Sequence, residues 1–204
     1  MISMKWQDTI KRTIDVIGSM ALIVITSPLW VIVSILIMVE DSGPIFYYRR
    51  VMGKNGGQFN ALKFRTMVVD AEAILERNRE LQRRFEQNFK LENDPRITRI
   101  GRILRKTSID EFPQLINVLR GEMSLVGPRM ISPPELSKYG EYGKKLLSVK
   151  PGCGGLWVAA GRQNLPYEQR ILLDMEYIDN WSFLLDMQII FKTAIAVISM
   201  RGAL

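Results

Sequence analysis

Histidine is absent from the 204-residue sequence, and cysteine occurs once, at Cys153. Without histidine, a nucleophile or general base has to be a carboxylate, lysine, tyrosine, serine or that single thiol. One cysteine excludes an internal disulfide and a cysteine-based zinc site, which is consistent with a reducing compartment. Because Cys153 stands in the glycine-rich cluster 151–155, we interpret it as a small buried or loop residue rather than a nucleophile.

Acidic residues are outnumbered by basic ones, 21 against 28, which gives a net charge of +7. Such a surface favours an anionic partner, whether nucleic acid, a phosphorylated substrate or anionic lipid. The length allows one compact domain or a domain with an anchor, and no linker, repeat or low-complexity segment divides residues 1–204.

Charged residues are missing from residues 16–39, an apolar stretch near the N-terminus. As a straight helix this stretch would reach roughly 36 Å, enough to cross a hydrocarbon core of about 30 Å. Hydropathy alone therefore predicts a single membrane-spanning helix. The stretch is too long for a cleaved signal peptide, and no small-residue cleavage site follows it.

Two features of this stretch argue against a simple span. Ser27 and Pro28 fall in its middle, where proline removes a backbone donor and bends a helix. Basic residues flank both ends, so the positive-inside rule gives no orientation. The flanking residues are Lys5, Lys11, Arg12, Arg49, Arg50 and Lys54. A hairpin that enters and leaves the same leaflet removes this conflict, provided that side chains such as Ser27 satisfy the backbone at the bend.

The segment after the apolar stretch predicts a short β-hairpin. Residues 45–48 and 59–64 are typical strands, and residues 54–57 form a turn that lacks the spacing of a phosphate-binding loop. Lys63 and Arg65 alternate with an apolar residue, so we expect them on one strand face.

Helical patterns follow the hairpin. Residues 70–92 predict one charged helix that ends at Asn93-Asp94-Pro95. Residues 96–106 form a basic amphipathic segment, a pattern typical of membrane surfaces, nucleic-acid binding or anionic substrates. That segment has no aromatic residue for base stacking, which weakens the nucleic-acid interpretation. Residues 183–200 are strongly apolar and predict a core helix or an in-plane membrane helix.

Asp110 and Glu111 are the most informative pair in the chain. They follow Arg105 and Lys106 and precede Arg129, which comes directly after a Gly-Pro turn. This arrangement suits a site for phosphate and a divalent metal, because the metal needs oxygen ligands and phosphates need cations.

A helix cap is the competing interpretation of the same pair. Ser108 and Glu111 match a Ser-x-x-Glu capping box, but that register places Pro113 inside the helix, where its missing N–H is needed. If Asp110 is the N-cap instead, Pro113 falls in the tolerated first turn. At this point, capping and catalysis are both open for Asp110.

Phosphate chemistry gives the pair a catalytic meaning. A carboxylate can attack a phosphoryl group and form an acyl phosphate, while Mg²⁺ and cationic side chains offset the charge of a diphosphate. Asp110 is the candidate nucleophile, and Glu111 is a metal ligand, an acid–base group or an electrostatic partner. Spacing alone does not divide these roles.

Motifs along nearly the whole chain resemble one known family. They are Ser27-Pro28, Lys63-Phe64-Arg65-Thr66-Met67, Thr107-Ser108-Ile109-Asp110-Glu111-Phe112-Pro113-Gln114, Met123-Ser124-Leu125-Val126-Gly127-Pro128-Arg129, Gly161-Arg162, Asp174, Tyr177, Lys192-Thr193 and Arg201-Gly202-Ala203. Together they resemble the bacterial sugar transferase family, the monotopic polyprenyl-phosphate phosphoglycosyl transferases.

The resemblance implies a reaction and a site. The reaction is transfer of a sugar-1-phosphate from a UDP-sugar to undecaprenyl phosphate, with release of UMP and with Mg²⁺ as cofactor. Asp110 is then the nucleophile that forms a phospho-sugar intermediate, and Asp110 and Glu111 are the candidate metal ligands. Lys63, Arg105 and Arg129 match family positions expected at the phosphates, and we add Arg65 to these candidate substrate-binding residues.

The resemblance also implies a fold and a location. The expected fold is mainly α with a short β-hairpin, in a single domain over residues 1–204. Residues 14–40 form a re-entrant membrane helix broken at Ser27-Pro28, which reverses the hydropathy-based preference, and 41–204 form the catalytic region with membrane-associated amphipathic helices. The expected partners are UDP-sugar, undecaprenyl phosphate and membrane lipid, not nucleic acid, at the cytoplasmic face of the bacterial inner membrane.

The chain departs from the family pattern at two places. The family usually reads Pro-Arg-Pro where this chain has Pro128-Arg129-Met130, so Met130 makes the loop less rigid. Val158 stands where the family usually has a glutamine, and the lost amide alters nucleotide or sugar contacts. Because the chain begins just before the apolar stretch, it resembles the minimal catalytic form of the family.

A rival hypothesis is a non-enzymatic, membrane-anchored basic adaptor that binds nucleic acid or anionic lipid. It explains the charge and the apolar stretch, but not adjacent acids among cations.

Overall fold

The computed structural model describes residues 2–88, 91, 94–160 and 165–198. The helices and strands are α1 (Ile2–Glu40), β1 (Phe46–Met52), β2 (Gln58–Phe64), α2 (Ala71–Arg77), α3 (Arg79–Asn88), α4 (Arg99–Thr107), α5 (Gln114–Arg120), β3 (Ser124–Val126), α6 (Gly143–Leu146), β4 (Gly152–Gly154), α7 (Leu156–Ala159), α8 (Tyr167–Asp179) and α9 (Phe183–Ile198). Three 3-10 segments, η1 (Lys54–Gly56), η2 (Ile109–Glu111) and η3 (Pro133–Tyr142), join them. The expected mainly helical fold with a short hairpin is confirmed, whereas the family-like residues Gly161, Arg162 and 201–203 lie outside the described residues.

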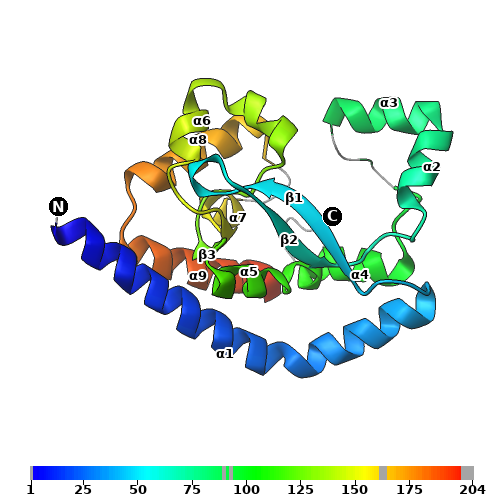
Figure 1. Cartoon of the computed structure of the whole chain (residues 1–204), viewed down its shortest axis with the longest axis horizontal. Coiled ribbons are helices and arrows are strands. Elements are labelled where there is room, and N and C mark those ends of the chain that lie inside the picture. The colour runs from blue at the N-terminus through cyan, green and yellow to red at the C-terminus, as the bar shows by residue number, and fades with distance from the viewer. Residues whose placement is uncertain (1, 89–90, 92–93, 161–164, 199–204) are drawn as a thin grey trace.

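Helix α1 runs along one side of the whole molecule and changes direction about midway (Figure 1). Of the helices in the described residues, it alone is long and apolar enough to cross a membrane. Pro28 lies inside it and has no N–H for the carbonyl of Val24, four residues earlier. The Ser27 hydroxyl donates to that carbonyl at 2.8 Å, so the side chain next to the proline satisfies the backbone acceptor that the proline leaves free.

Both ends of α1 are attached to the same body of helices and strands. Near its start, the Arg12 guanidinium donates to the carbonyls of Val118 and Leu119 at 2.6 and 2.7 Å, at the end of α5. At its other end, the Glu40 carboxylate accepts from the backbone N–H groups that begin α4. Between these attachments, large apolar side chains of α1 are exposed: Ile17, Met20, Leu22, Val24, Ile25, Val31, Ile32, Ile35, Leu36, Met38 and Val39.

The predicted β-hairpin is present, with β1 longer than expected. Strands β1 and β2 pair antiparallel, and Tyr47 is opposite Lys63. Phe64, at the end of β2, is 1% exposed and packs between α1 and α4 with Val33, Ile37 and Leu104. The hairpin is therefore fixed to α1 by its apolar face.

The single charged helix expected over residues 70–92 is wrong. Helices α2 and α3 are separated by Asn78, whose backbone is extended and whose side-chain oxygen accepts from the N–H of Leu81 at 3.0 Å. Asn78 therefore competes with the helix through a local side-chain bond, as asparagine does at helix starts. The two helices project away from the body (Figure 1), and the expected helix end at Asn93 lies outside the described residues.

The capping alternative for Asp110, which the sequence left open, is contradicted by the structure. Helix α4 ends at Thr107, Ser108 adopts a left-handed conformation with φ of 58°, and Asp110 lies inside the 3-10 turn η2. Helix α5 begins after Pro113, and no side chain caps it. The left-handed Ser108 ends α4, and the chain continues directly into η2. Asp110 therefore lies inside a turn and does not cap a helix.

The last third of the chain covers the body with α8 and α9. Strands β3 and β4 form a short parallel pair that the sequence pattern did not predict. In α9, Ile189 is buried against Val126 of β3, while Phe183, Leu184 and Phe191 are exposed. One side of α9 packs against the body, and the other side exposes apolar side chains. Both features agree with the core or in-plane membrane helix expected there.

A close approach of α4 to β2 supplies a test of the packing. A Cβ on Gly101 would lie 2.1 Å from the Thr66 carbonyl oxygen, so Gly101→Ala has to push α4 away from the backbone that follows β2. We expect destabilisation by about 1–3 kcal/mol, measured as a lower thermal midpoint in detergent.

Gly57→Ala is the matched control, because its added Cβ meets its nearest neighbour at 3.5 Å and its φ is −59°. Equal midpoints for Gly101→Ala and the native protein would contradict this packing of α4.

Candidate functional site

The two carboxylates identified in the sequence lie in η2, between α4 and α5, and face β2. The Lys63 ammonium is 2.5 Å from Glu111 Oε1 and 3.8 Å from Asp110 Oδ2. Of the Asp110 side chain 10% is exposed, whereas 35% of the Glu111 side chain is exposed. One strand lysine therefore bridges a recessed carboxylate and a more accessible one.

The two carboxylates differ in their tendency to ionise. Burial raises the pKa of Asp110 to about 6, although Lys63 and Arg105 act in the opposite direction. Desolvation also disfavours the charged form of Glu111, but the Lys63 ammonium and more distant Arg129 and Arg49 hold its pKa below the usual value. The environment thus keeps Glu111 anionic and leaves Asp110 close to its titration range at neutral pH.

Arg105 lies on α4 and is oriented by the segment that follows β2. Its Nε donates to Thr66 Oγ1 at 2.9 Å. Burial lowers the pKa of its guanidinium, whereas attraction to Asp110 raises it. Arg105 therefore contributes positive charge to the Asp110 side of the site.

Arg129 follows β3, and two contacts fix its position: a hydrogen bond from its backbone to Asp174 and the stacking of its guanidinium on Trp157. Its N–H donates to Asp174 Oδ1 at 3.0 Å, and its guanidinium carbon lies 4.9 Å from the centre of the Trp157 ring. Its Nε is buried and has no partner among the described residues. This guanidinium therefore keeps donor capacity for an anion near Glu111.

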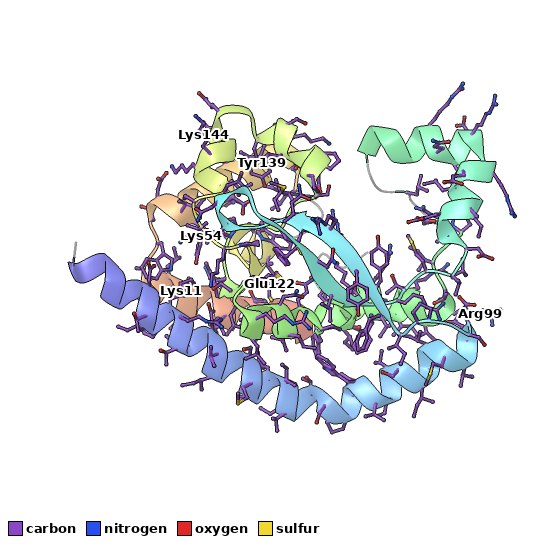
Figure 2. All side chains as sticks on the ribbon, in the orientation of Figure 1. Lys11, Lys54, Arg99, Glu122, Tyr139 and Lys144 are labelled. Atoms are coloured by element: carbon purple, nitrogen blue, oxygen red, sulfur yellow. The ribbon has the colours of Figure 1, made fainter. Side chains whose placement is uncertain are left out.

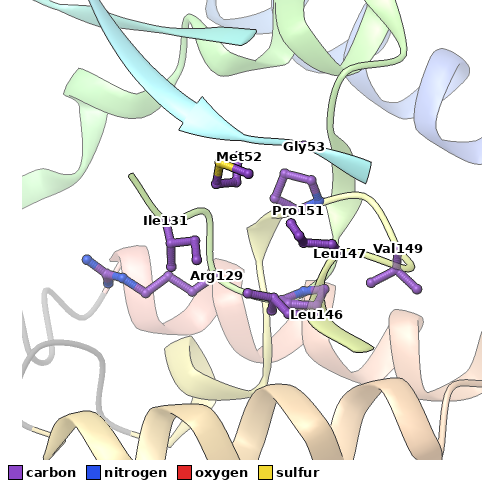
Figure 3. Close-up of a pocket in the computed structure, with 9 residues that line it drawn as sticks. Met52, Gly53, Arg129, Ile131, Leu146, Leu147, Val149 and Pro151 are labelled. Atoms are coloured by element: carbon purple, nitrogen blue, oxygen red, sulfur yellow. The ribbon is translucent and has the colours of Figure 1, made fainter. Parts of the chain in front are cut away.

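A small pocket beside Arg129 is apolar and is not the phosphate site. Met52, Ile131, Leu146 and Leu147 line it, together with Arg129. The Arg129 side chain extends away from these groups (Figure 3). The charged end of Arg129 thus belongs with the carboxylates rather than with this pocket.

Arg65 is separated from the other predicted site residues. It lies just beyond β2, is 7% exposed and pairs with Asp41 at 3.0 Å at the end of α1. Lys63 instead contacts the carboxylate pair. The structure therefore brings Lys63, Arg105 and Arg129 together around Asp110 and Glu111, and it places Arg65 at the C-terminal end of α1.

Sequence reasoning missed several residues that shape the site. Arg49 of β1 pairs with Glu135 at 3.0 Å and adds positive charge near Glu111. Tyr139 donates to Asp174 Oδ2 at 2.8 Å, beneath the Arg129 backbone. Arg49 lies two residues after Tyr47, the residue opposite Lys63, so both point to the same face of the hairpin as Lys63. This alternation could have predicted Arg49 as a residue near the site. The local pattern around Tyr139 carries no comparable signal.

The residues that depart from the family pattern are both in the protein interior. Met130 is 8% exposed and Val158 is 5% exposed. Cys153 packs against the core cluster that includes Met130, and burial raises the pKa of its thiol. The interpretation of Cys153 as a packing residue is confirmed by these contacts.

The carboxylate pair fits a magnesium ion that shares its ligands with a substrate. Within the described residues, no group of three or more histidine, cysteine, aspartate or glutamate residues forms a metal cage. Mg²⁺ often needs only one or two protein carboxylates, because water and substrate phosphates supply the other ligands. Asp110 and Glu111 provide such oxygen ligands, and the surrounding cations suit phosphates.

Comparisons with known proteins agree with this chemistry. The chain is 44% identical over 198 residues to the "UDP-galactose-lipid carrier transferase" of Erwinia amylovora, covering 95% of this chain and 41% of that protein. It is 42% identical over 198 residues to the "Undecaprenyl-phosphate galactose phosphotransferase" of Salmonella typhimurium, with 95% and 41% covered. It is 41% identical over 197 residues to the "Exopolysaccharide production protein ExoY" of Rhizobium meliloti, with 95% and 87% covered.

The chain therefore spans about two fifths of the length of the first two relatives and most of the third. The family model described as "Bacterial sugar transferase" matches residues 6–200, which include α1, the carboxylate pair and Arg129. The chain belongs to the bacterial sugar transferase family.

Proposed function

We propose that the protein transfers a sugar-1-phosphate from a UDP-sugar to undecaprenyl phosphate and releases UMP. The observation that carries this proposal is a buried carboxylate, Asp110, beside an anionic Glu111 and under the positive charge of Lys63, Arg105 and Arg129. A diphosphate brings negative charge and needs such cations, whereas a neutral substrate does not. The names of two relatives refer to a lipid carrier and to galactose in those proteins, and one of them names undecaprenyl phosphate.

The proposed reaction has two displacements at one phosphorus. An Asp110 carboxylate oxygen bonds to the phosphorus that carries the sugar, and the bond from that phosphorus to the bridging oxygen breaks, so that UMP leaves with the electron pair. A phosphate oxygen of undecaprenyl phosphate then attacks the same phosphorus. The aspartyl–phosphorus bond breaks, and the free carboxylate of Asp110 is regenerated.

The neighbouring side chains have separate duties in this proposal. Lys63 holds Asp110 in its anionic form and fixes Glu111, because it contacts both carboxylates. Arg129 has an unpaired buried Nε and binds a substrate phosphate. Asp110 and Glu111 would hold Mg²⁺, and the ion would supply further neutralisation of phosphate charge.

We also propose that α1 is a re-entrant membrane helix. A straight crossing from Asp15 to Glu40 would separate those residues by the thickness of the bilayer. Yet Asp15 accepts from Ser124 and Leu125, and Glu40 accepts from Arg99 and Ile100, all in one body. The bend at Pro28 lets the exposed apolar middle enter lipid while both polar ends stay on the cytoplasmic face of the bacterial inner membrane.

This placement suits the two substrates. A UDP-sugar is soluble in the cytoplasm, whereas undecaprenyl phosphate stays in the membrane with its phosphate at the surface. A site on the cytoplasmic face, close to the apolar surfaces of α1 and α9, is open to both. The reaction would start the assembly of a lipid-linked glycan. An assay of the purified protein with a panel of UDP-sugars would identify the sugar that it transfers.

Replacement of the nucleophile is the direct test of the reaction. Asp110→Asn should abolish both UMP release and the phospho-sugar adduct, because an amide is a poor nucleophile and a poor Mg²⁺ ligand. UMP release is measured with Mg²⁺, UDP-sugars and polyprenyl phosphate, and the adduct is measured by intact-protein mass spectrometry.

Asp70→Asn is the control, because Asp70 is exposed and makes no side-chain cap bond to α2. Full turnover in a clean Asp110→Asn preparation would rule out Asp110 as nucleophile. An absence of UMP release by the native protein with every UDP-sugar would favour the adaptor hypothesis.

Arg129→Ala tests the phosphate contact. We expect kcat/KM for the UDP-sugar to fall about 100-fold, because a charged hydrogen bond to phosphate is lost, while membrane association is unchanged. Steady-state kinetics and vesicle flotation measure the two properties. Arg50→Ala removes an exposed arginine of β1 that bonds to Gln58 and should leave kcat/KM as it is. Equal kcat/KM for Arg129→Ala and the native protein would remove Arg129 from the site.

Cysteine accessibility in sealed cells tests the topology. In a Cys153→Ser background, single cysteine probes at Ser3 and Ser42 should both be protected from an impermeant external reagent. Replacing Ser27-Pro28 with Ala-Leu removes the helix break and should favour a straight span, which exposes one probe. Labelling of the Ser3 probe from outside in the otherwise native sequence would establish an ordinary spanning helix.

A further inference from the structure

Helix α1 contacts the two halves of the phosphate site separately. One half is β3, which leads through Gly127 and Pro128 to Arg129. The other half is α4, which carries Arg105 and leads into the turn with Asp110 and Glu111. Figure 2 shows Lys11 in the N-terminal part of α1 and Arg99, the first residue of α4, near the opposite end of α1. The membrane helix therefore extends from one half of the site to the other.

At the first contact, a buried carboxylate of α1 holds β3. Asp15 is 4% exposed, and its Oδ1 accepts from Ser124 Oγ and from the N–H of Leu125, each at 2.9 Å. One turn earlier, Lys11 donates to the Val126 carbonyl at 3.0 Å. All three residues of β3 are thus bonded to α1, immediately before the loop that carries Arg129.

The second contact is a carboxylate of α1 at the start of α4. Glu40 Oε1 accepts from the N–H of Arg99 at 2.6 Å, and Oε2 accepts from the N–H of Ile100 at 2.9 Å. These N–H groups have no partner within the helix, because the first turn of any α-helix leaves its donors free. The end of the membrane helix thereby fixes the position of α4 and of the residues that follow it.

We propose that α1 is a brace for the phosphate site, in which Asp15 positions Arg129 through β3 and Glu40 positions Arg105 and Asp110 through α4. The bent helix sets the distance between these two halves. Asp15 and Glu40 are positioning residues, since neither touches the carboxylate pair. The assignment rests on the proposed function for the substrate, but the bracing contacts themselves do not depend on it.

Hydrogen–deuterium exchange of the full chain in lipid nanodiscs tests the brace without any activity. Asp15→Ala leaves two donors at β3 without their acceptor, so exchange should rise in residues 124–130 and stay native in 99–107. Glu40→Ala should produce the reverse pattern. Asp8→Ala removes an exposed carboxylate of the same helix and should change neither segment. Equal loosening of both segments by each variant would show general destabilisation and overturn the brace.

Kinetics then tests whether the brace acts through Arg129. Asp15→Ala should lower kcat/KM for the UDP-sugar about tenfold in the native background, but by less than about twofold in an Arg129→Ala background. Asp15→Asn should restore most of the activity, because its Oδ1 still accepts both hydrogen bonds. A full tenfold loss in the Arg129→Ala background would mean that Asp15 does not act through Arg129.

A milder variant covers the case in which Asp15→Ala does not fold. Ser124→Ala removes one of the two donors to Asp15 and should raise exchange in residues 124–130 alone, with a smaller loss of kcat/KM. Native exchange and native kinetics in Ser124→Ala would also overturn the proposal. If the native protein shows no turnover, the proposed function fails, and the exchange patterns still decide whether α1 braces the two segments.

Discussion

The contact between Lys63 and the two carboxylates is the constraint on which the site depends. Asp110 and Glu111 are adjacent in sequence, and their like charges would oppose ionisation of both. Lys63 lies within 4 Å of each carboxylate and relieves that repulsion. Because Lys63 belongs to β2 and the carboxylates belong to η2, their ionisation depends on how the hairpin packs against the turn. The fold around the site therefore has to hold these two segments together.

The surrounding elements provide that attachment through close packing rather than through long regular structure. Gly101 allows α4 to approach the backbone of Thr66, and Thr66 in turn orients Arg105. The left-handed Ser108 ends α4 and directs Asp110 inward. The same burial raises the pKa of Asp110 to about 6, while Glu111 keeps more solvent contact and a lowered pKa. The geometry thus separates two residues that spacing alone treats as equivalent.

The sequence predicted the features that depend on neighbouring residues, namely the hairpin and the carboxylate pair. Two short strand-like runs around the turn at residues 54–57 predicted the hairpin, and the adjacent acids among cations indicated the centre of the candidate site. The pattern did not predict Ser108 as a left-handed residue, nor Asp174 as the acceptor for the Arg129 backbone. Asp174 and Arg129 are 45 residues apart, so their contact depends on how α8 packs. The capping alternative for Asp110 fails for a local reason, because the left-handed Ser108 ends α4 and places Asp110 inside η2.

Hydropathy alone does not distinguish a straight membrane span from the re-entrant helix that we propose for α1. Hydropathy sums the apolar residues of 16–39, and that sum is the same for a straight span and for a bent helix. The difference lies in a few polar atoms. Ser27 satisfies the carbonyl that Pro28 leaves free, so a bend in lipid does not require an unpaired backbone acceptor. Asp15 and Glu40 then bind backbone donors of one body, which a straight span would pull apart. These contacts make the bent form compatible with an assembled phosphate site, and a straight form has to break one set of them.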